Sequence, residues 1–150
     1  MGEKIQAVFT NMCMVSDGGC VLVQNRVDPD WPGICFPGGH VEDGESIVES
    51  VIRELREETG LTVEEPRLCG IKEWQREDGS RYVVFLFRTN RFHGTLASSE
   101  EGEVFWLPRE ELLNCRLAQG FEEMVKIFED DSLSELYYYK EEGERRMKVF

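Results

Sequence analysis

The amino-acid sequence predicts one α/β domain, α+β in some classifications, in which a mixed sheet packs against a few helices. Two observations support this fold class. Apolar runs of strand length recur along the chain between turn-forming residues, and two longer stretches instead place their apolar residues at helical spacing. The 150 residues suffice for one ordinary hydrophobic core. Because we find no repeat, linker or low-complexity stretch, we expect a single domain spanning residues 1–150.

The first expected elements are two strands joined in a hairpin. A run rich in Val, Phe, Thr and Met covers residues 5–15, and a second apolar run covers 21–23 after the turn-forming sequence Ser16 to Gly19. Residues 27–39 hold three prolines and three glycines. This segment is therefore expected to be a loop that ends in the pair Gly38-Gly39.

A helix is expected to follow at about residues 45–59. Its apolar residues recur at helical spacing and would form one stripe that packs on the sheet: Ile47, Val48, Val51, Ile52 and Leu55. Gly60 stands where a glycine commonly ends a helix.

The second half of the chain predicts three further strands, one or two helices and a terminal hairpin. Asp78-Gly79 marks the turn between the first two of these strands. The strand at 82–89 is so apolar that we expect both of its faces to be buried. The expected strands cover residues 68–75, 82–89 and 104–107. A helix is expected at 110–113 or at 120–129, and the helical spacing of apolar residues favours 120–129. Two short strands are expected within 135–150, on either side of Glu142-Gly143.

The charge balance excludes some functions. The chain has 17 Lys and Arg against 30 Asp and Glu, a formal net charge of −13, which would repel a nucleic-acid polymer or an anionic membrane surface. A small polyanion could still bind if metal ions supplied positive charge. The five cysteines are odd in number and scattered, which favours buried, free thiols. With no targeting or membrane-spanning pattern, we expect a cytoplasmic protein.

Three glutamates on the first helix suggest a metal site. Glu54, Glu57 and Glu58 stand at i, i+3 and i+4, so their carboxylates share one face although like charges repel there. Hard cations such as Mg²⁺ or Mn²⁺ prefer such oxygen ligands. Gly38 and Gly39 would let the preceding loop bring a backbone carbonyl to the same point. Taken alone, the glutamates could equally decorate a solvated helix.

The spacing around these glutamates resembles the signature of a known family. Gly39 is followed after five residues by Glu45, and after seven more by the sequence Arg53-Glu54-Leu55-x-Glu57-Glu58-x-Gly60-Leu61. This is similar to the Nudix box, here residues 39–61. The flanking segments 36–41 and 100–106 also resemble the MutT-like branch of the Nudix hydrolases.

The resemblance implies a fold and a set of site residues. The fold would be an α/β/α sandwich around a mixed sheet, with the C-terminal hairpin as an extension. Glu54, Glu57 and Glu58 would bind Mg²⁺, or Mn²⁺, together with the Gly39 carbonyl. Arg53 would orient the catalytic glutamate with Glu45 as its structural partner, and Gly38 and Gly60 would shape the box.

The same resemblance implies a hydrolase in which water attacks a phosphorus atom. A carboxylate would take the proton of the attacking water, and the candidates are Glu57, Glu100 and Glu101, with Glu54 also in the catalytic set. The sequence leaves the choice among them open.

The favoured substrate is an oxidised or non-standard nucleoside triphosphate such as 8-oxo-dGTP, cut to the monophosphate and pyrophosphate. The alternatives are ADP-ribose and a dinucleoside polyphosphate. The proline typical of many ADP-ribose pyrophosphatases is missing, since no proline lies between Arg67 and Leu107, and Tyr82 is out of register with the tyrosine marker of the dinucleoside polyphosphate hydrolases. A Nudix module that senses a nucleotide without cutting it usually lacks box carboxylates, and here none is missing.

Three polar residues are candidates for contacting the nucleobase. Asn11, on the first strand, could read a purine edge or could be an ordinary strand amide. Asn114 and Gln119 stand where related enzymes contact the base, but they could also be loop residues without a role.

Aromatic residues supply the remaining candidates. Trp31 and Trp74 could stack on a base, whereas Trp106 is expected in the core. Tyr137 to Tyr139 could form a dimer contact or pack on their own domain. The expected partner is therefore a small nucleotide, with no polymer or membrane, and the protein is expected to be a monomer or a homodimer.

Overall fold

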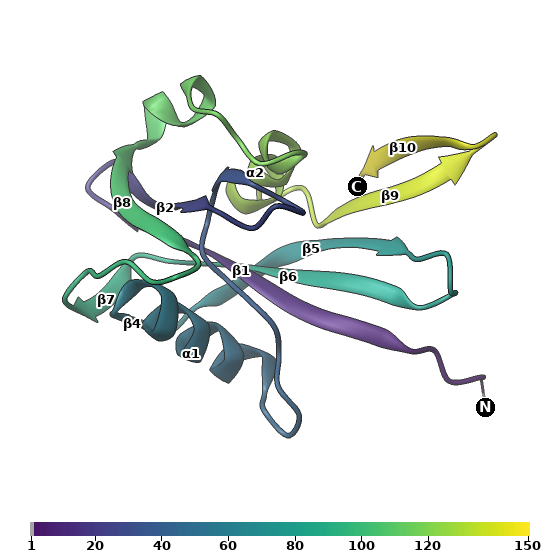
Figure 1. Cartoon of the computed structure of the whole chain (residues 1–150), viewed down its shortest axis with the longest axis horizontal. Helices are drawn as coiled ribbons and strands as arrows, with labels where there is room; N and C mark the ends of the chain where they lie inside the picture. The colour runs from purple at the N-terminus through teal and green to yellow at the C-terminus, as the bar shows by residue number, and fades with distance from the viewer. Residues whose placement is uncertain (1) are drawn as a thin grey trace.

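The computed structural model describes residues 2–150 and shows a curled mixed sheet with helices on either side (Figure 1). The helices are α1 (Ile47–Thr59), a 3-10 helix η1 (Arg109–Asn114) and α2 (Phe121–Glu129). The strands are β1 (Ala7–Asp17), β2 (Cys20–Arg26), β3 (Gly33–Cys35), β4 (Leu61–Glu64), β5 (Arg67–Gln75), β6 (Arg81–Thr89), β7 (Arg91–Gly94), β8 (Gly102–Pro108), β9 (Glu135–Glu141) and β10 (Glu144–Val149).

The main sheet has the strand order β10-β9-β5-β6-β1-β2-β3, with β8 paired to β2. β1 runs parallel to β6 over nine residue pairs from Ala7↔Arg81 to Val15↔Thr89. In contrast, β1 meets β2 only at Ser16↔Val21 and Asp17↔Cys20. The predicted hairpin is therefore present, but its two strands separate after the turn. This separation leaves one edge of β1 free for another segment.

Side chains on β1 alternate between two cores, as expected for a strand buried on both faces. Met12 and Met14 belong to the core that contains α2. Cys13 and Val15 belong to the core that contains Val51 and Leu55 of α1. Figure 1 shows α1 and α2 on opposite sides of β1. The α/β/α arrangement predicted from the sequence is confirmed.

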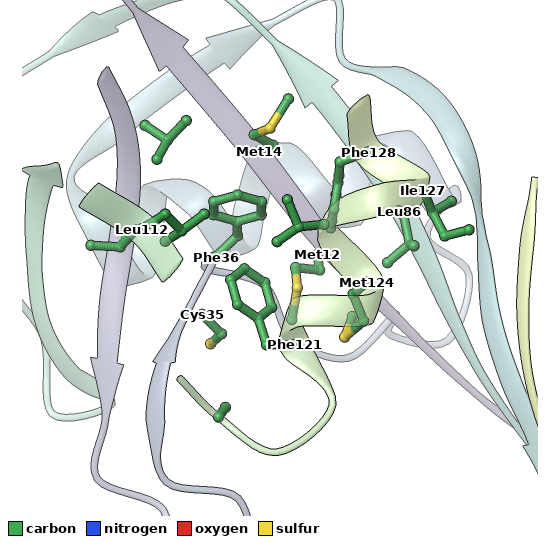
Figure 2. Close-up of a cluster of buried hydrophobic side chains, with 14 of the residues drawn as sticks. Met12, Met14, Cys35, Phe36, Leu86, Leu112, Phe121, Met124, Ile127 and Phe128 are labelled. Carbon is green, nitrogen blue, oxygen red and sulfur yellow. The ribbon is translucent and has the colours of Figure 1, made fainter. Parts of the chain in front are cut away.

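Phe36 fixes the loop that leads to the paired glycines. Its ring makes edge-to-face contacts with Phe121 and Phe128 of α2, at centroid distances of 4.8 and 5.0 Å. Figure 2 shows this ring among the buried side chains of α2 and β1. Because Phe36 is only 1% exposed, the chain enters the glycine pair from a rigid position.

Helix α1 begins and ends with well-formed caps. The Ser46 hydroxyl accepts the Glu49 N–H, and the Glu49 carboxylate accepts the Ser46 N–H, which is a capping box. Gly60 ends the helix in the left-handed region at φ 76°, as predicted. The expected apolar stripe was wrong at Val48, which is 42% exposed, because it lies past the edge of the face that contacts the sheet.

Several elements differ from the sequence prediction. The predicted loop 27–39 contains β3, which pairs with the end of β2. β4 and β7 were not predicted; they form a separate two-stranded sheet. Each of these strands has only three or four residues, too few to show an alternating pattern. The expectation that β6 is buried on both faces was wrong at Val83 and Phe85, which are half-buried.

The C-terminal hairpin extends the main sheet. β9 pairs parallel with β5 from Ile71↔Glu135 to Trp74↔Tyr138, and β10 forms the edge. As expected, the five cysteines are free thiols, but the expectation that all are buried was wrong: only Cys13 and Cys35 are buried, and the other three are half-buried. None of the helices within residues 2–150 is both long enough and apolar enough to cross a membrane.

Candidate active site

The free edge of β1 binds the loop that carries the paired glycines. The backbone N–H groups of Asn11 and Cys13 donate to the carbonyls of Gly39 and Pro37 at 2.8 and 2.9 Å. At Gly38 the loop lies so close to β1 that a methyl group would overlap the Asn11 backbone carbonyl. Glycine is therefore required at position 38 by close approach of two backbones.

Gly39 brings this loop against helix α1. A methyl group at position 39 would overlap the carboxylate of Glu54. Asn11 joins the same two segments, since its amide nitrogen donates to Ser50 Oγ at 2.9 Å and its amide oxygen accepts the Gly39 N–H at 3.3 Å. The structure thus gives Asn11 a positioning role, while its reading of a base stays a prediction.

Arg53 organises the acidic face of α1. Its guanidinium donates to both carboxylate oxygens of Glu45, at 2.7 and 3.0 Å, and to the His40 carbonyl at 2.8 Å. Its Nη1 donates to Glu54 and Glu57, at 3.1 Å each. The hydrogen bonds from Arg53 lower the pKa of the Glu45 carboxyl. Glu45 and Arg53 therefore form the bidentate pair that the sequence pattern implied.

Glu58 is the most buried carboxylate of the site, at 5% exposure. It accepts the Gly38 N–H at 3.2 Å and the Gln24 amide at 3.4 Å. Burial, with the nearby charge of Glu54, raises the pKa of Glu58 to about 8. The other amide atom of Gln24, Oε1, is buried and has no hydrogen-bond partner. Beside Glu58, the Gln24 Oε1 atom is therefore a buried hydrogen-bond acceptor for which the described part of the protein supplies no donor.

A cavity of about 1060 Å³ connects these groups with the outer strands of the sheet. Glu54, Glu58 and Glu101 line it together with Gly38 and Gly39. Its other lining residues come mainly from β1, β5, β6, β9 and β10, from the loop after β2, and from α2 with the loop before it. The cavity therefore runs from the paired glycines across the sheet to the C-terminal hairpin.

The three box glutamates do not gather at one point, contrary to the sequence expectation. Within residues 2–150, no three acidic, histidine or cysteine side chains stand together as a metal site. Glu57 is exposed, pairs with Arg53 at 3.1 Å, and is not among the cavity-lining residues. Like charges repel, and the Arg53 guanidinium lies between Glu54 and Glu57 instead.

The residues nevertheless suit a hard divalent cation. Glu54 and Glu58 offer carboxylate oxygens at the cavity, beside Gly39 and Gly38 respectively. Burial raises the pKa of both carboxyls, as expected where a cation would compensate the buried charge. The Gly39 carbonyl accepts the Asn11 N–H, and its part in holding a cation stays a prediction. That Glu57 joins them as a ligand stays a prediction.

The other predicted site residues separate into two groups. Glu101 and Gln119 line the cavity, and the Gln119 backbone carbonyl accepts the Trp31 indole N–H at 2.7 Å. Glu100 is exposed and does not line the cavity. Asn114 is exposed at the end of η1, where its amide donates to Glu111 at 3.2 Å, and it does not line the cavity. This placement favours the alternative that Asn114 has no role in the site.

The aromatic predictions have mixed outcomes. Trp31 and Trp74 both line the cavity, consistent with stacking on a base. Trp106 is half-buried against the α1 core, where its ring packs on Phe92 at 5.2 Å. Of the three consecutive tyrosines, only Tyr138 faces the cavity, while the rings of Tyr137 and Tyr139 stack on each other at 5.7 Å.

Sequence reasoning missed three residues that the structure brings to the site. Lys72 and Gln24 are buried polar side chains on strands, and Tyr138 arrives from the C-terminal hairpin. For Lys72, the only indication in the sequence was its place within the expected strand 68–75, between Ile71 and Glu73. Nothing in the sequence connects Gln24 with Glu58, because their contact joins residues far apart in the chain.

Comparisons with known proteins agree with this geometry. The NUDIX domain family matches residues 6–130. The chain is 34% identical over 116 residues to an uncharacterised Nudix hydrolase of Bacillus subtilis, covering 74% of this chain and 72% of that protein. It is also 34% identical over 116 residues to the CTP pyrophosphohydrolase of Escherichia coli, covering 75% of this chain and 83% of that protein.

Solved structures show the same fold. The MutT protein of Bacillus halodurans is 31% identical and superposes with a TM-score of 0.76, covering 95% of this chain and 97% of that one. The E. coli ORF135 protein is 26% identical with a TM-score of 0.70, covering 83% and 89% of the two chains. The family match, these relatives and the complete box around Glu54, Glu57 and Glu58 all agree. The chain therefore belongs to the NUDIX domain family and is a Nudix hydrolase.

Proposed function

We propose that this hydrolase cuts an oxidised or non-standard nucleoside triphosphate, with 8-oxo-dGTP as the leading candidate, to the monophosphate and pyrophosphate in the presence of Mg²⁺. The observation that supports this most is the cavity itself. It combines carboxylates beside a glycine loop with aromatic side chains, so one ligand could place phosphates at the former and a base at the latter.

The roles follow from position. Glu54, Glu58 and the Gly39 carbonyl, joined by Glu57, would hold Mg²⁺ or Mn²⁺. When bound, such a cation neutralises phosphate oxygens and makes water a better nucleophile. Arg53 donates to the carboxylates of Glu54 and Glu57 at 3.1 Å each, and so holds both on one face of α1.

A carboxylate is needed to accept the proton as water attacks phosphorus and the phosphoanhydride P–O bond breaks. Glu101 lines the cavity. Glu57 does not line it, but it shares the Arg53 guanidinium with Glu54, which does. Glu100 is exposed and does not line the cavity. It is the weaker choice because, within residues 2–150, its side chain has no hydrogen bond that links it to a lining residue. We therefore assign the base to Glu57 or Glu101.

The choice of substrate draws on the relatives. One is named a CTP pyrophosphohydrolase, and a human protein named an 8-oxo-dGDP phosphatase is 36% identical over 82 residues, covering 51% of this chain and 24% of that protein. Both names describe nucleotides with a carbonyl-bearing base. Another relative, 29% identical over 98 residues and covering 65% of this chain and 58% of that protein, is named an ADP-ribose pyrophosphatase. The preference over ADP-ribose therefore rests on the missing marker proline.

The test separates and quantifies the products formed from 8-oxo-dGTP, dGTP, CTP, ADP-ribose and a diadenosine polyphosphate by anion-exchange chromatography, with Mg²⁺ and with EDTA. Chromatography is needed because the last two substrates would give two phosphorylated products and no free pyrophosphate. Wild type should release pyrophosphate fastest from 8-oxo-dGTP and only with metal. Glu57→Gln should lower kcat by at least about a hundredfold. Glu122→Gln, an exposed glutamate on α2, is the matched control and should leave kcat unchanged.

Two outcomes would contradict the proposal. Faster turnover of ADP-ribose or the diadenosine polyphosphate than of any triphosphate would refute the substrate assignment. Equal loss of activity in Glu57→Gln and Glu122→Gln would show that the box glutamate has no special role.

A further inference from the structure

Lys72 is a buried cation without an ionic partner. It lies on β5, is 7% exposed, and lines the same cavity as Glu54 and Glu58. The one hydrogen bond of its ammonium group is to the Met124 sulfur at 3.6 Å, a weak acceptor. In the described part of the chain, no carboxylate lies within salt-bridge distance of Lys72. Two of its three N–H donors therefore have no acceptor supplied by the described part of the protein.

Three aromatic rings surround this ammonium group. Its nitrogen lies 5.2 Å from the ring centroid of Trp31, 5.5 Å from that of Trp74 and 5.2 Å from that of Tyr138. Ring faces stabilise a buried cation, but they do not replace hydrogen-bond acceptors. The three residues come from separate parts of the chain, and Tyr138 is supplied by the C-terminal hairpin.

The surroundings of Lys72 suit a flat ring that carries an acceptor atom. Trp31 and Trp74 line the cavity with aromatic surface, on which a base packs but a phosphate does not. Trp74 also stacks on Tyr82 at 4.5 Å, and the Arg26 guanidinium lies 5.3 Å from the Trp31 ring centroid, so a base would contact only the parts of these rings that line the cavity. The sheet order places β5 and β9 on one side of β6 and β1, whereas the loop of Gly38 and Gly39 pairs with the opposite edge of β1. One nucleotide could thus place its phosphates at the glycine loop and the flat ring at its other end beside Lys72.

The chemistry of an ammonium group further narrows the ligand. It only donates hydrogen bonds, so it favours an exocyclic carbonyl oxygen. Guanine presents two acceptors, O6 and N7, at its major-groove edge, whereas adenine presents the amino donor N6 beside N7. That amino group would oppose the ammonium donors, and leaving a buried donor unpaired is costly.

We propose that Lys72 donates a hydrogen bond to an exocyclic carbonyl oxygen of the nucleobase, so that the cage of Trp31, Trp74 and Tyr138 selects carbonyl-bearing bases against adenine. This inference rests on the proposed function in assuming that a nucleotide fills the cavity. It adds the residue that selects the base.

The test is calorimetric titration of GMP, 8-oxo-dGMP, CMP, UMP and AMP into the intact chain in EDTA, which requires neither metal nor turnover. Lys72→Met should weaken binding of the four carbonyl-bearing nucleotides by at least about tenfold, which is 1.4 kcal/mol at 25 °C, and change AMP by less than about threefold. Lys72→Arg, which keeps the charge and donors, should retain part of the preference. Lys140→Met is the matched control, because Lys140 is exposed on β9 and pairs with Glu77.

The outcomes separate this inference from the proposed function. Equal weakening of AMP and the other nucleotides in Lys72→Met, or no weakening of any, would overturn the role of Lys72. Absence of binding to the wild type would also overturn it, even if metal-dependent hydrolysis of triphosphates is found. The predicted pattern in a protein that releases no pyrophosphate would support the base site and refute the hydrolysis.

Discussion

Replacing Lys72 with methionine should make the protein more stable while impairing the binding of a base. Burial is the main cause that lowers the Lys72 pKa from 10.5 to about 8, and the charge of Arg145 adds to it. At 1.36 kcal/mol for each tenfold change in proton affinity, this difference corresponds to about 3 kcal/mol of destabilisation at pH 7. Methionine has a similar length and no charge, so Lys72→Met should recover up to about 3 kcal/mol.

The pH dependence gives this prediction a specific signature. The folded-state pKa of Lys72 is lower than its unfolded value, so the cost is fully present below about pH 8. As pH rises from about 8 towards 10.5, the folded protein releases the proton before the unfolded chain does, and the cost disappears. The stability advantage of Lys72→Met over wild type should therefore shrink across that interval.

The assay is urea unfolding followed by far-UV circular dichroism at pH 7, 8, 9 and 10. Circular dichroism is preferred because tryptophans contact Lys72 and their fluorescence would change with the substitution itself. Lys140→Met, at an exposed position, should stay within about 0.5 kcal/mol of wild type. A Lys72→Met variant that is less stable at pH 7, or whose advantage is the same at every pH, would refute the reasoning.

Three further predictions concern the loop and helix of the box. Ser46→Ala removes the capping hydroxyl that accepts the Glu49 N–H and should cost about 1 kcal/mol in urea unfolding; an unchanged midpoint would contradict the role of the cap. Gly38→Ala forces a methyl group onto the Asn11 carbonyl and should lower stability by about 1–3 kcal/mol, a loss that a thermal melt equal to wild type would disprove. Glu58→Gln removes the buried carboxyl whose pKa burial raises to about 8, so it should raise the melting temperature in EDTA and abolish the increase caused by Mg²⁺; a full Mg²⁺ response in this variant would exclude Glu58 as a ligand.

The parts of the fold that could be predicted are those encoded by neighbouring residues. Helix α1 is an example, because its apolar spacing, its box glutamates and Gly60 all lie within one segment. Its true start could also have been found, since Ser46 followed at the third position by Glu49 is the capping-box signature. The short β4 and β7 could not, because each has only four residues and depends on its partner.

The parts of the site that could not be predicted are those assembled across the sheet. The sequence places Glu54, Glu57 and Glu58 on one helix, but only the structure shows that Glu57 turns to Arg53 while Glu58 is buried beside Gln24. Tyr138 reaches Lys72 because β9 pairs with β5, a register that no local pattern specifies. The identity of such long-range neighbours depends on topology, and topology was predicted only at the level of fold class.

The charge distribution explains how so acidic a chain could bind a nucleotide. Although the net charge is −13, five cations line the cavity: Arg26, Lys72, Arg76, Arg145 and Arg146. Acidic residues outside the box line it too, namely Asp28, Asp30, Glu101 and Glu123, and Arg26 is paired with Asp28. Glu54 and Glu58 on the glycine-loop side would repel phosphates unless a cation lay between them. A nucleobase could therefore bind to the protein alone, whereas its phosphates would require metal, so recognition of the base and the metal-dependent chemistry would be separable steps within one cavity.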